Sequence, residues 1–227
     1  MPVTITEPEP APWLERGGAE SGLGSPVAPG AAALAALEDE LGPPDVLVAN
    51  AGIGAYGAFA DVDPDELERL VRVNVLGTLH VVRAVVPGMI RRRQGHIVTI
   101  GSIAGRIGSP FEALYSATKF AQVGFTEALS VELSPYGVGV SMVNPGPVVT
   151  DFFDARAHAY DRARPRPVPP QRVAEAVIRA VDTGALEQFV PRCIRHAVAV
   201  RHLVPPLFRW GTRRSFRAEL AADEARR

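Results

Sequence analysis

Four short apolar segments alternate with longer helical patterns along most of this chain, and this alternation is the feature that most restricts its fold. The apolar segments are residues 46–49, 96–100, 139–143 and 188–190. The helical patterns are residues 31–41, a segment from Asp63-Pro64 to about residue 93, and residues 112–134 and 171–183. Strands that alternate with helices of this length pair in parallel through right-handed crossovers. The sequence therefore predicts an α/β fold with a partial doubly wound (Rossmann-like) parallel sheet and helices on both faces.

The two ends of the chain differ in composition from this middle part. Residues 1–30 are rich in Pro, Gly, Ala and Glu without sustained apolar periodicity, which indicates a flexible segment. Residues 31–191 carry the α/β pattern, and residues 192–227 carry nine arginines against three acidic residues. Because this tail is also apolar, we expect it either to lie on an anionic membrane or to pack over a substrate pocket or dimer surface.

Composition excludes several classes of protein. The single cysteine, Cys193, cannot form an intramolecular disulfide, so a cytoplasmic location is the default expectation. The five histidines show no metal-ligand spacing, and we expect no metal site. The sequence shows no apolar run approaching a membrane span and no signal peptide at its acidic start. Arginines 91–93 suit a helix C-terminus, so we expect no nucleic-acid binding.

Lys119 stands out because it is the one lysine among 24 basic residues. It follows Tyr115 by four positions on an expected helix, so both side chains leave the same face. A free tyrosine titrates near ~10, and a neighbouring ammonium would lower the pKa of its hydroxyl. Lysine also has a compact head group that can hydrogen-bond a sugar hydroxyl. The alternative is a surface tyrosine beside a surface cation.

Two further polar residues lie at informative places. Ser102 follows the strand at residues 96–100, in the region where parallel sheets present groups to ligands; it could instead cap the following turn. Asn74 falls on the apolar stripe of its helix, where an unpaired amide would cost on the order of 1–3 kcal/mol. It is either a buried asparagine that pairs with backbone or one that holds a water in a proton path.

Taken in order along the chain, these motifs resemble the short-chain dehydrogenase/reductase family over about residues 31–190. The motifs are Asn50-Ala51-Gly52, Asn74, Ser102, Tyr115-x-x-x-Lys119 and Pro145-Gly146-Pro147-Val148-Val149-Thr150. The resemblance implies a catalytic tetrad of Asn74, Ser102, Tyr115 and Lys119. In this scheme Tyr115 exchanges a proton with the substrate oxygen and Ser102 binds that oxygen. Lys119 holds the cofactor ribose and lowers the tyrosine pKa, and Asn74 positions a water.

The resemblance also implies a cofactor site for NAD or NADP. Its expected residues are Asn50, Ala51, Gly52, Lys119, Pro145, Gly146, Val148 and Thr150. A full member of this family begins with a strand, a glycine-rich turn and two further strand–helix steps, for which the 49 residues before Asn50 are too few. Residues 18–24 have the spacing of such a turn, but prolines flank them. We therefore expect the N-terminal βαβαβ portion to be missing and residues 46–49 to form an exposed sheet edge.

Two functions follow from these expectations. The first is an NAD(P)-dependent oxidoreductase that interconverts an alcohol and a carbonyl, with Phe152 and Phe153 favouring an apolar small-molecule substrate. The second is an inactive truncated member of the family that acts at most as an interaction subunit. For either function we expect a homo-oligomer.

Overall fold

The computed structural model describes residues 36–156 and 165–227. The expected flexible segment at residues 1–30 and the glycine-rich candidate at 18–24 therefore lie outside the described residues. The chain divides into two compact units, Met1–Gly42 and Pro43–Arg227. In the first, residues 36–41 are helical and end at Gly42, which has a φ of +82°. All that follows concerns the second unit.

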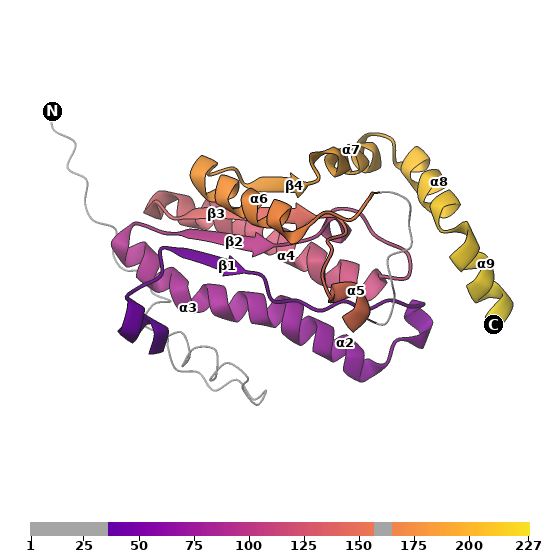
Figure 1. Ribbon diagram of the computed structural model, residues 1–227, viewed down its shortest axis with the longest axis horizontal. Helices are drawn as coiled ribbons and strands as arrows, with labels where there is room; N and C mark the ends of the chain where they lie inside the picture. Colours follow the sequence, from indigo (N-terminus) through magenta and orange to yellow (C-terminus); the bar gives the residue numbers. More distant parts are fainter. Residues whose placement is uncertain (1–35, 157–164) are drawn as a thin grey trace. The chain divides into compact units, whose positions relative to one another are not determined.

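The second unit contains a sheet of four parallel strands in the order β1-β2-β3-β4 (Figure 1). They are β1 (Val46–Ala49), β2 (His96–Ile100), β3 (Gly139–Pro145) and β4 (Glu187–Val190). The expected strands at residues 46–49 and 96–100 are confirmed, and those at 139–143 and 188–190 are each slightly longer than expected. Sequential strands pair with one another, so the crossovers between them must carry the chain over the faces of the sheet.

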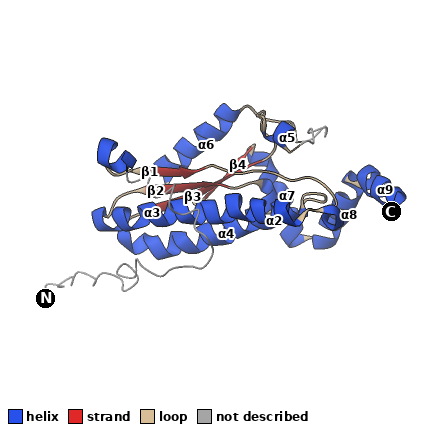
Figure 2. Ribbon diagram, turned by 90° about the horizontal axis from the view of Figure 1, so that it is seen from below, coloured by secondary structure: helices blue, strands red, loops and turns tan. Residues whose placement is uncertain are grey.

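Helices cover both faces of the sheet, as the alternation predicts (Figure 2). One face carries α2 (Pro64–Leu70), a π-helical turn (Val71–Leu76), α3 (Gly77–Arg92) and α4 (Ala113–Leu133); the other carries α6 (Pro170–Thr183). Beneath α6, Val98 and Val143 pack against Ala176 and Ala180, all of them buried. On the α4 side, the hydroxyls of Thr99 and Thr126 hydrogen-bond each other at 2.9 Å.

β1 lies at the edge of the sheet among the described residues, as expected. Val46 and Val48 remain 43% and 42% exposed, although Val48 pairs in register with the fully buried Val98. The difference arises because α6 packs mainly over β2, β3 and β4, while Val48 faces the cleft. The exposed edge therefore offers both unpaired backbone groups and apolar side chains.

The segment Pro64–Arg92 corrects the expectation that no apolar run in the sequence approaches a membrane span. This 29-residue helix is long and apolar enough to cross a membrane by length and composition, since an 18-residue window within it has a mean hydropathy of 1.5. Its buried residues include Asn74 and Thr78, which hydrogen-bond to α4. A core helix passes the same test, and 33% of the most apolar window of this helix is buried in the structure.

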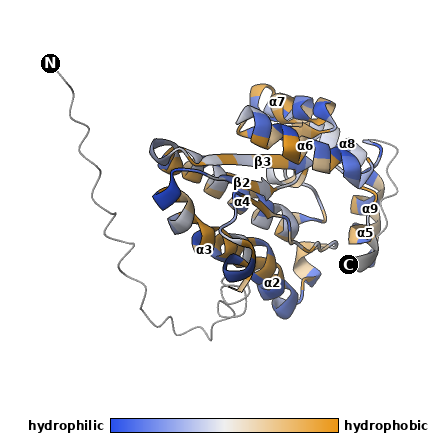
Figure 3. Ribbon diagram, turned by 60° about the vertical axis from the view of Figure 1, so that its left-hand side comes forward, coloured by the Kyte–Doolittle hydropathy of each residue, from blue (hydrophilic) through white to orange (hydrophobic). Residues whose placement is uncertain are grey.

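The remaining elements lie near the carboxyl ends of the strands, in the C-terminal tail or, for the one 3-10 turn that follows α4, just before the amino end of β3. They are the 3-10 turns η1 (Phe59–Asp61), η3 (Ile103–Gly105), η4 (Ser134–Tyr136) and η5 (Arg192–Ile194), and the helices α5 (Phe152–Ala155), α7 (Arg195–Leu203), α8 (Pro205–Ser215) and α9 (Arg217–Arg226). The tail is thus three short helices. Figure 3 shows hydrophobic and hydrophilic positions interleaved along α7.

Candidate active site

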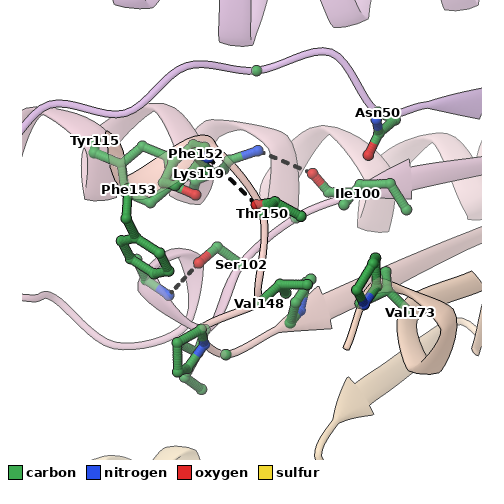
Figure 4. A pocket seen from close by; sticks show the side chains of 18 of the residues that line it. Asn50, Ile100, Ser102, Tyr115, Lys119, Val148, Thr150, Phe152, Phe153 and Val173 are labelled. Carbon is green, nitrogen blue, oxygen red and sulfur yellow. Dashed lines mark hydrogen bonds between the residues drawn. The ribbon is translucent and has the colours of Figure 1, made fainter. Parts of the chain in front are cut away.

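A cleft of about 700 Å³ opens at the carboxyl ends of the strands. It is bounded by the segments that follow β1, β2 and β3, by α4 and by α6, which is where ligands bind in open parallel sheets. Figure 4 shows that Ser102, Tyr115, Lys119, Phe152 and Phe153 gather there from separate parts of the chain.

Most of the residues that the sequence singles out line this cleft. They are Asn50, Gly52, Ser102, Tyr115, Lys119, Pro145, Gly146, Val148 and Thr150. Two predicted residues do not line it: Ala51 is exposed outside the cleft, and Asn74 is fully buried. The turn at residues 145–150 is held by backbone hydrogen bonds, from Gly146 N to Val190 O and from Val149 N to Val168 O.

Ser102 begins the turn η3 and faces Tyr115. Its hydroxyl accepts a hydrogen bond from Ala104 N at 3.1 Å, which is the capping role considered from the sequence, and it lies near enough to the Tyr115 hydroxyl to lower the pKa of that group. The turn can approach α4 closely because Gly105 has no side chain. A Cβ atom at Gly105 would lie 2.7 Å from Lys119 O. Gly105 therefore holds Ser102 close to Tyr115, a contribution that the sequence analysis did not identify.

Tyr115 lies on the first turns of α4 and is 8% exposed. Burial raises the pKa of its hydroxyl to about 12, and the Glu112 carboxylate adds to this rise. The hydrogen bond from Ser102 and the positive charge of Arg156 act in the opposite direction. The expectation that Lys119 lowers the pKa of Tyr115 is therefore not met in this structure, because desolvation of the phenolate outweighs the stabilising groups.

Lys119 is buried directly behind Tyr115, with its Nζ 5.8 Å from the centre of the tyrosine ring. The ammonium donates hydrogen bonds to Ile100 O at 3.0 Å and to Oε1 of Gln122 at 2.9 Å. Burial lowers its pKa to about 8. The alternative of a surface tyrosine beside a surface cation is thus wrong, since both side chains are buried.

Gln122 is a residue of this site that the sequence analysis missed. Its Nε2 donates to Asn74 O at 2.7 Å and to Thr78 Oγ1 at 2.8 Å, while its Oε1 accepts from Lys119. Asn74 lies in the π-helical turn, where the regular helical hydrogen-bond pattern is interrupted. A signal was present in the sequence, because Gln122 follows Lys119 by three positions on the same helix face.

The side chain of Asn74 is fully paired with protein groups. Its Oδ1 accepts from Ile53 N at 2.8 Å, and its Nδ2 donates to Ile53 O at 2.9 Å and to Thr118 Oγ1 at 3.0 Å. This arrangement favours the interpretation of Asn74 as a buried asparagine that pairs with backbone. It fixes the chain that follows β1, and hence the position of Gly52 beside Lys119.

The cleft has an aromatic half next to Tyr115. It is lined by Tyr56, Phe152, Phe153 and Phe216. The guanidinium of Arg156 lies 4.6 Å from the centre of the Phe153 ring and 5.3 Å from that of Tyr56, and it forms an ion pair with the Glu112 carboxylate. Because Arg156 is paired and covered by rings, this half of the cleft is predominantly apolar.

The polar half of the cleft fits part of a nicotinamide dinucleotide. Lys119 supplies a buried cationic donor, and a Cβ atom at Gly52 would lie 3.3 Å from Asn74 Oδ1 and 3.6 Å from Lys119 Nζ, so glycine preserves space there. These groups suit a ribose and an adjoining planar ring. Among the described residues, no strand precedes β1 to carry a glycine-rich pyrophosphate turn, so the fit covers the nicotinamide–ribose half.

Comparison with protein families shows which family has this arrangement of residues. The model of the short chain dehydrogenase family matches residues 27–161, more than half of the chain. The chain belongs to the short chain dehydrogenase family. Human retinol dehydrogenase 8 is a relative, 45% identical over 108 residues, which cover 48% of this chain and 35% of that protein.

Solved structures of family members share the fold. A short chain dehydrogenase/reductase from Burkholderia phymatum in complex with NAD superimposes with a TM-score of 0.71 at 27% identity, covering 80% of this chain and 73% of that one. A gluconate 5-dehydrogenase from Burkholderia cenocepacia in complex with NADP and tartrate superimposes with a TM-score of 0.67 at 28% identity. The match covers 74% of this chain and 71% of that one. The chain spans about a third to three-fifths of the length of the curated relatives it matches.

Proposed function

We propose that this protein is an NAD(P)-dependent oxidoreductase that interconverts an apolar alcohol and the corresponding carbonyl compound. The observation that carries the proposal is the meeting of Ser102, Tyr115 and Lys119 in one cleft, between a polar half and an aromatic half. Such a cleft can hold a cofactor on one side of the reacting oxygen and a substrate on the other.

In this proposal Tyr115 is the proton donor to the substrate oxygen. Since burial keeps its pKa at about 12, the phenol is protonated at neutral pH, which is the state that carbonyl reduction requires. Ser102 lies beside the tyrosine hydroxyl and would donate to the substrate oxygen, so that this oxygen is held near both hydroxyls. When bound, a reduced nicotinamide would supply the hydride for the carbonyl carbon.

The cofactor would be held by residues at the ends of β1 and β3 and by one residue of α4. Lys119 and Asn50 would bind the ribose, and the turn at residues 145–150 would bind the nicotinamide ring. The ammonium of Lys119 is already oriented by Ile100 O and Gln122 Oε1, so one donor remains for a sugar hydroxyl. NAD and NADP both satisfy this assignment, because they are identical at the nicotinamide end.

The aromatic half supports an apolar substrate. Phe152 and Phe216 face the cleft, and Arg156 is occupied by Glu112 and by the rings around it. A free anionic substrate would have to compete with the Glu112 carboxylate for Arg156. One relative is named for retinol, which is an apolar alcohol.

A second candidate function rests on a different observation. The exposed edge of β1, with Val46 and Val48 in contact with solvent, would allow pairing with another chain and a role as an interaction subunit. Homo-oligomerisation and a cytoplasmic location stay predictions under either function.

Cofactor titration followed by a turnover assay separates the two functions. We expect saturable quenching or enhancement of NADH or NADPH fluorescence by the purified chain, and oxidation of that cofactor with long-chain or polycyclic ketones in preference to sugars. Tyr115→Phe should abolish turnover and keep cofactor binding, whereas Tyr136→Phe, a tyrosine outside the cleft, should leave both unchanged. No binding at millimolar cofactor would favour the interaction subunit.

A further inference from the structure

The C-terminal helices carry an exposed apolar stripe that the proposed chemistry does not use. Its members follow one another at intervals of one or three residues along α7 and α8, and they are Val200, Leu203, Val204, Leu207 and Trp210. Leu203 is 81% exposed and Trp210 is 62% exposed. Positions three apart share one side of a helix, so Val200 and Leu203 lie on one side of α7 and Leu207 and Trp210 on one side of α8; Val204 lies between the two helices.

The other side of the same helices is already packed against the catalytic unit. Phe216 is buried and stacks on Phe111 at 6.4 Å between ring centres. Arg201 donates to Arg106 O at 2.7 Å and lies 5.1 Å from the centre of the Phe120 ring. The apolar stripe is therefore the outward surface of an anchored segment and is not needed for packing within the described part of the chain.

The charge around the apolar stripe has one sign. Residues 192–218 contain seven arginines and no aspartate or glutamate. Six of these arginines are exposed: Arg192, Arg195, Arg209, Arg213, Arg214 and Arg217. The guanidinium of Arg214 lies 6.0 Å from the centre of the Trp210 ring. Arginines that flank exposed leucines and a tryptophan complement the headgroups and the acyl region of an anionic bilayer.

We propose that α7 and α8 dock this protein onto an anionic lipid bilayer through the apolar stripe and the surrounding arginines. A nucleic acid would use the arginines and leave Leu203 and Leu207 in water, whereas a bilayer uses both kinds of side chain. α8 ends at Ser215, and the next residue, Phe216, lines the cleft. Docking therefore brings the aromatic half of the cleft close to the lipid. An apolar substrate would then have a short path from the bilayer to the cleft, a step that rests on the proposed function.

Vesicle flotation of the full chain tests the docking without cofactor or substrate. We expect binding to vesicles of phosphatidylcholine and phosphatidylserine and much weaker binding to phosphatidylcholine alone. The double variant Arg209→Glu and Arg213→Glu should weaken binding by about 20-fold or more, because each basic residue near an anionic surface contributes about 1 kcal/mol. Leu207→Ser with Trp210→Ser should weaken it at least as much. Val131→Ser, at an exposed position on α4, should bind as the wild type does.

Tryptophan fluorescence reports the docking to vesicles at Trp210. In a Trp13→Phe background Trp210 is the remaining tryptophan, and its emission should shift to shorter wavelength on addition of the anionic vesicles. No shift, or equal binding by the wild type and both double variants, would overturn the proposal. Tyr115→Phe should still bind vesicles, so that loss of turnover and loss of docking are separate outcomes: an inactive chain that binds vesicles refutes only the proposed function.

Discussion

The ammonium of Lys119 and the side-chain amide of Gln122 form a 2.9 Å hydrogen bond in the buried region behind Tyr115. The other end of the amide donates to Asn74 O and Thr78 Oγ1, so Gln122 connects α4 to the π-helical turn and to α3. An oxygen acceptor favours the charged form of the lysine and opposes the effect of burial. Gln122 is therefore expected to position Lys119 and to set its charge.

The first prediction concerns the pKa of Lys119, which can be measured directly because the chain has one lysine. In protein labelled with isotopes at lysine, a single side-chain signal should titrate near pH 8. Gln122→Leu should move that titration to lower pH, because the ammonium loses an acceptor. Gln122→Glu should move it to higher pH, because a carboxylate stabilises the ammonium.

The pair of variants makes this prediction independent of enzyme activity. Both replace the same side chain and both remove the bonds to Asn74 and Thr78, so a general loosening of the site would move the two titrations in the same direction. Opposite shifts support the positioning role of Gln122. A titration near the ordinary value of ~10.4 in the wild type would contradict the burial of Lys119 itself.

The second prediction is that Lys119 makes folding stability depend on pH in the alkaline range. Its pKa is lower in the folded chain, about 8, than in the unfolded chain, so the unfolded chain binds more protons between these values and stability rises with pH there. Relative to Lys119→Met, the wild type should gain up to about 3 kcal/mol in free energy of unfolding between pH 8 and pH ~10.5. Urea unfolding of both proteins at several pH values measures the difference, and a constant difference would refute it.

The third prediction concerns the edge strand. Val46→Lys should reduce self-association of the purified chain, because a charge on an exposed edge disfavours strand pairing between molecules. Its free energy of unfolding should change by less than about 1 kcal/mol, since Val46 is already 43% exposed. Val131→Lys, on α4, is the matched control and should leave self-association unchanged in light scattering. An equal decrease in both variants would mean that net charge, and not the edge, is responsible.

The parts of this molecule that follow from local patterns could be predicted from the sequence. Strands, crossover helices and the meeting of Ser102 with Tyr115 and Lys119 follow from hydrophobic period and from the rule that strand ends share one edge. The ion pair between Glu112 and Arg156 could not, because it joins residues 44 positions apart that meet only once α4 and β3 are packed together. The raised pKa of Tyr115 was also missed, since burial is a property of the packed structure and outweighs the lowering by Ser102 and Arg156.

The last prediction tests how closely the turn after β2 must approach α4. Gly105→Ala places a Cβ atom 2.7 Å from Lys119 O, a backbone atom that cannot move without displacing the helix. We expect a loss of about 1–3 kcal/mol in free energy of unfolding, as for other overpacked positions, and a larger separation of Ser102 from Tyr115. Gly108→Ala in the same loop is the control, because its Cβ would meet nothing within 4 Å. The urea midpoint should fall for Gly105→Ala only. Equal midpoints of the two variants would show that the turn can move away from α4 without a loss of stability.

Turnover gives a second measurement of the same change at Gly105. Gly105→Ala should lose more turnover than its loss of stability accounts for, because proton transfer depends on the positions of the Ser102 and Tyr115 hydroxyls.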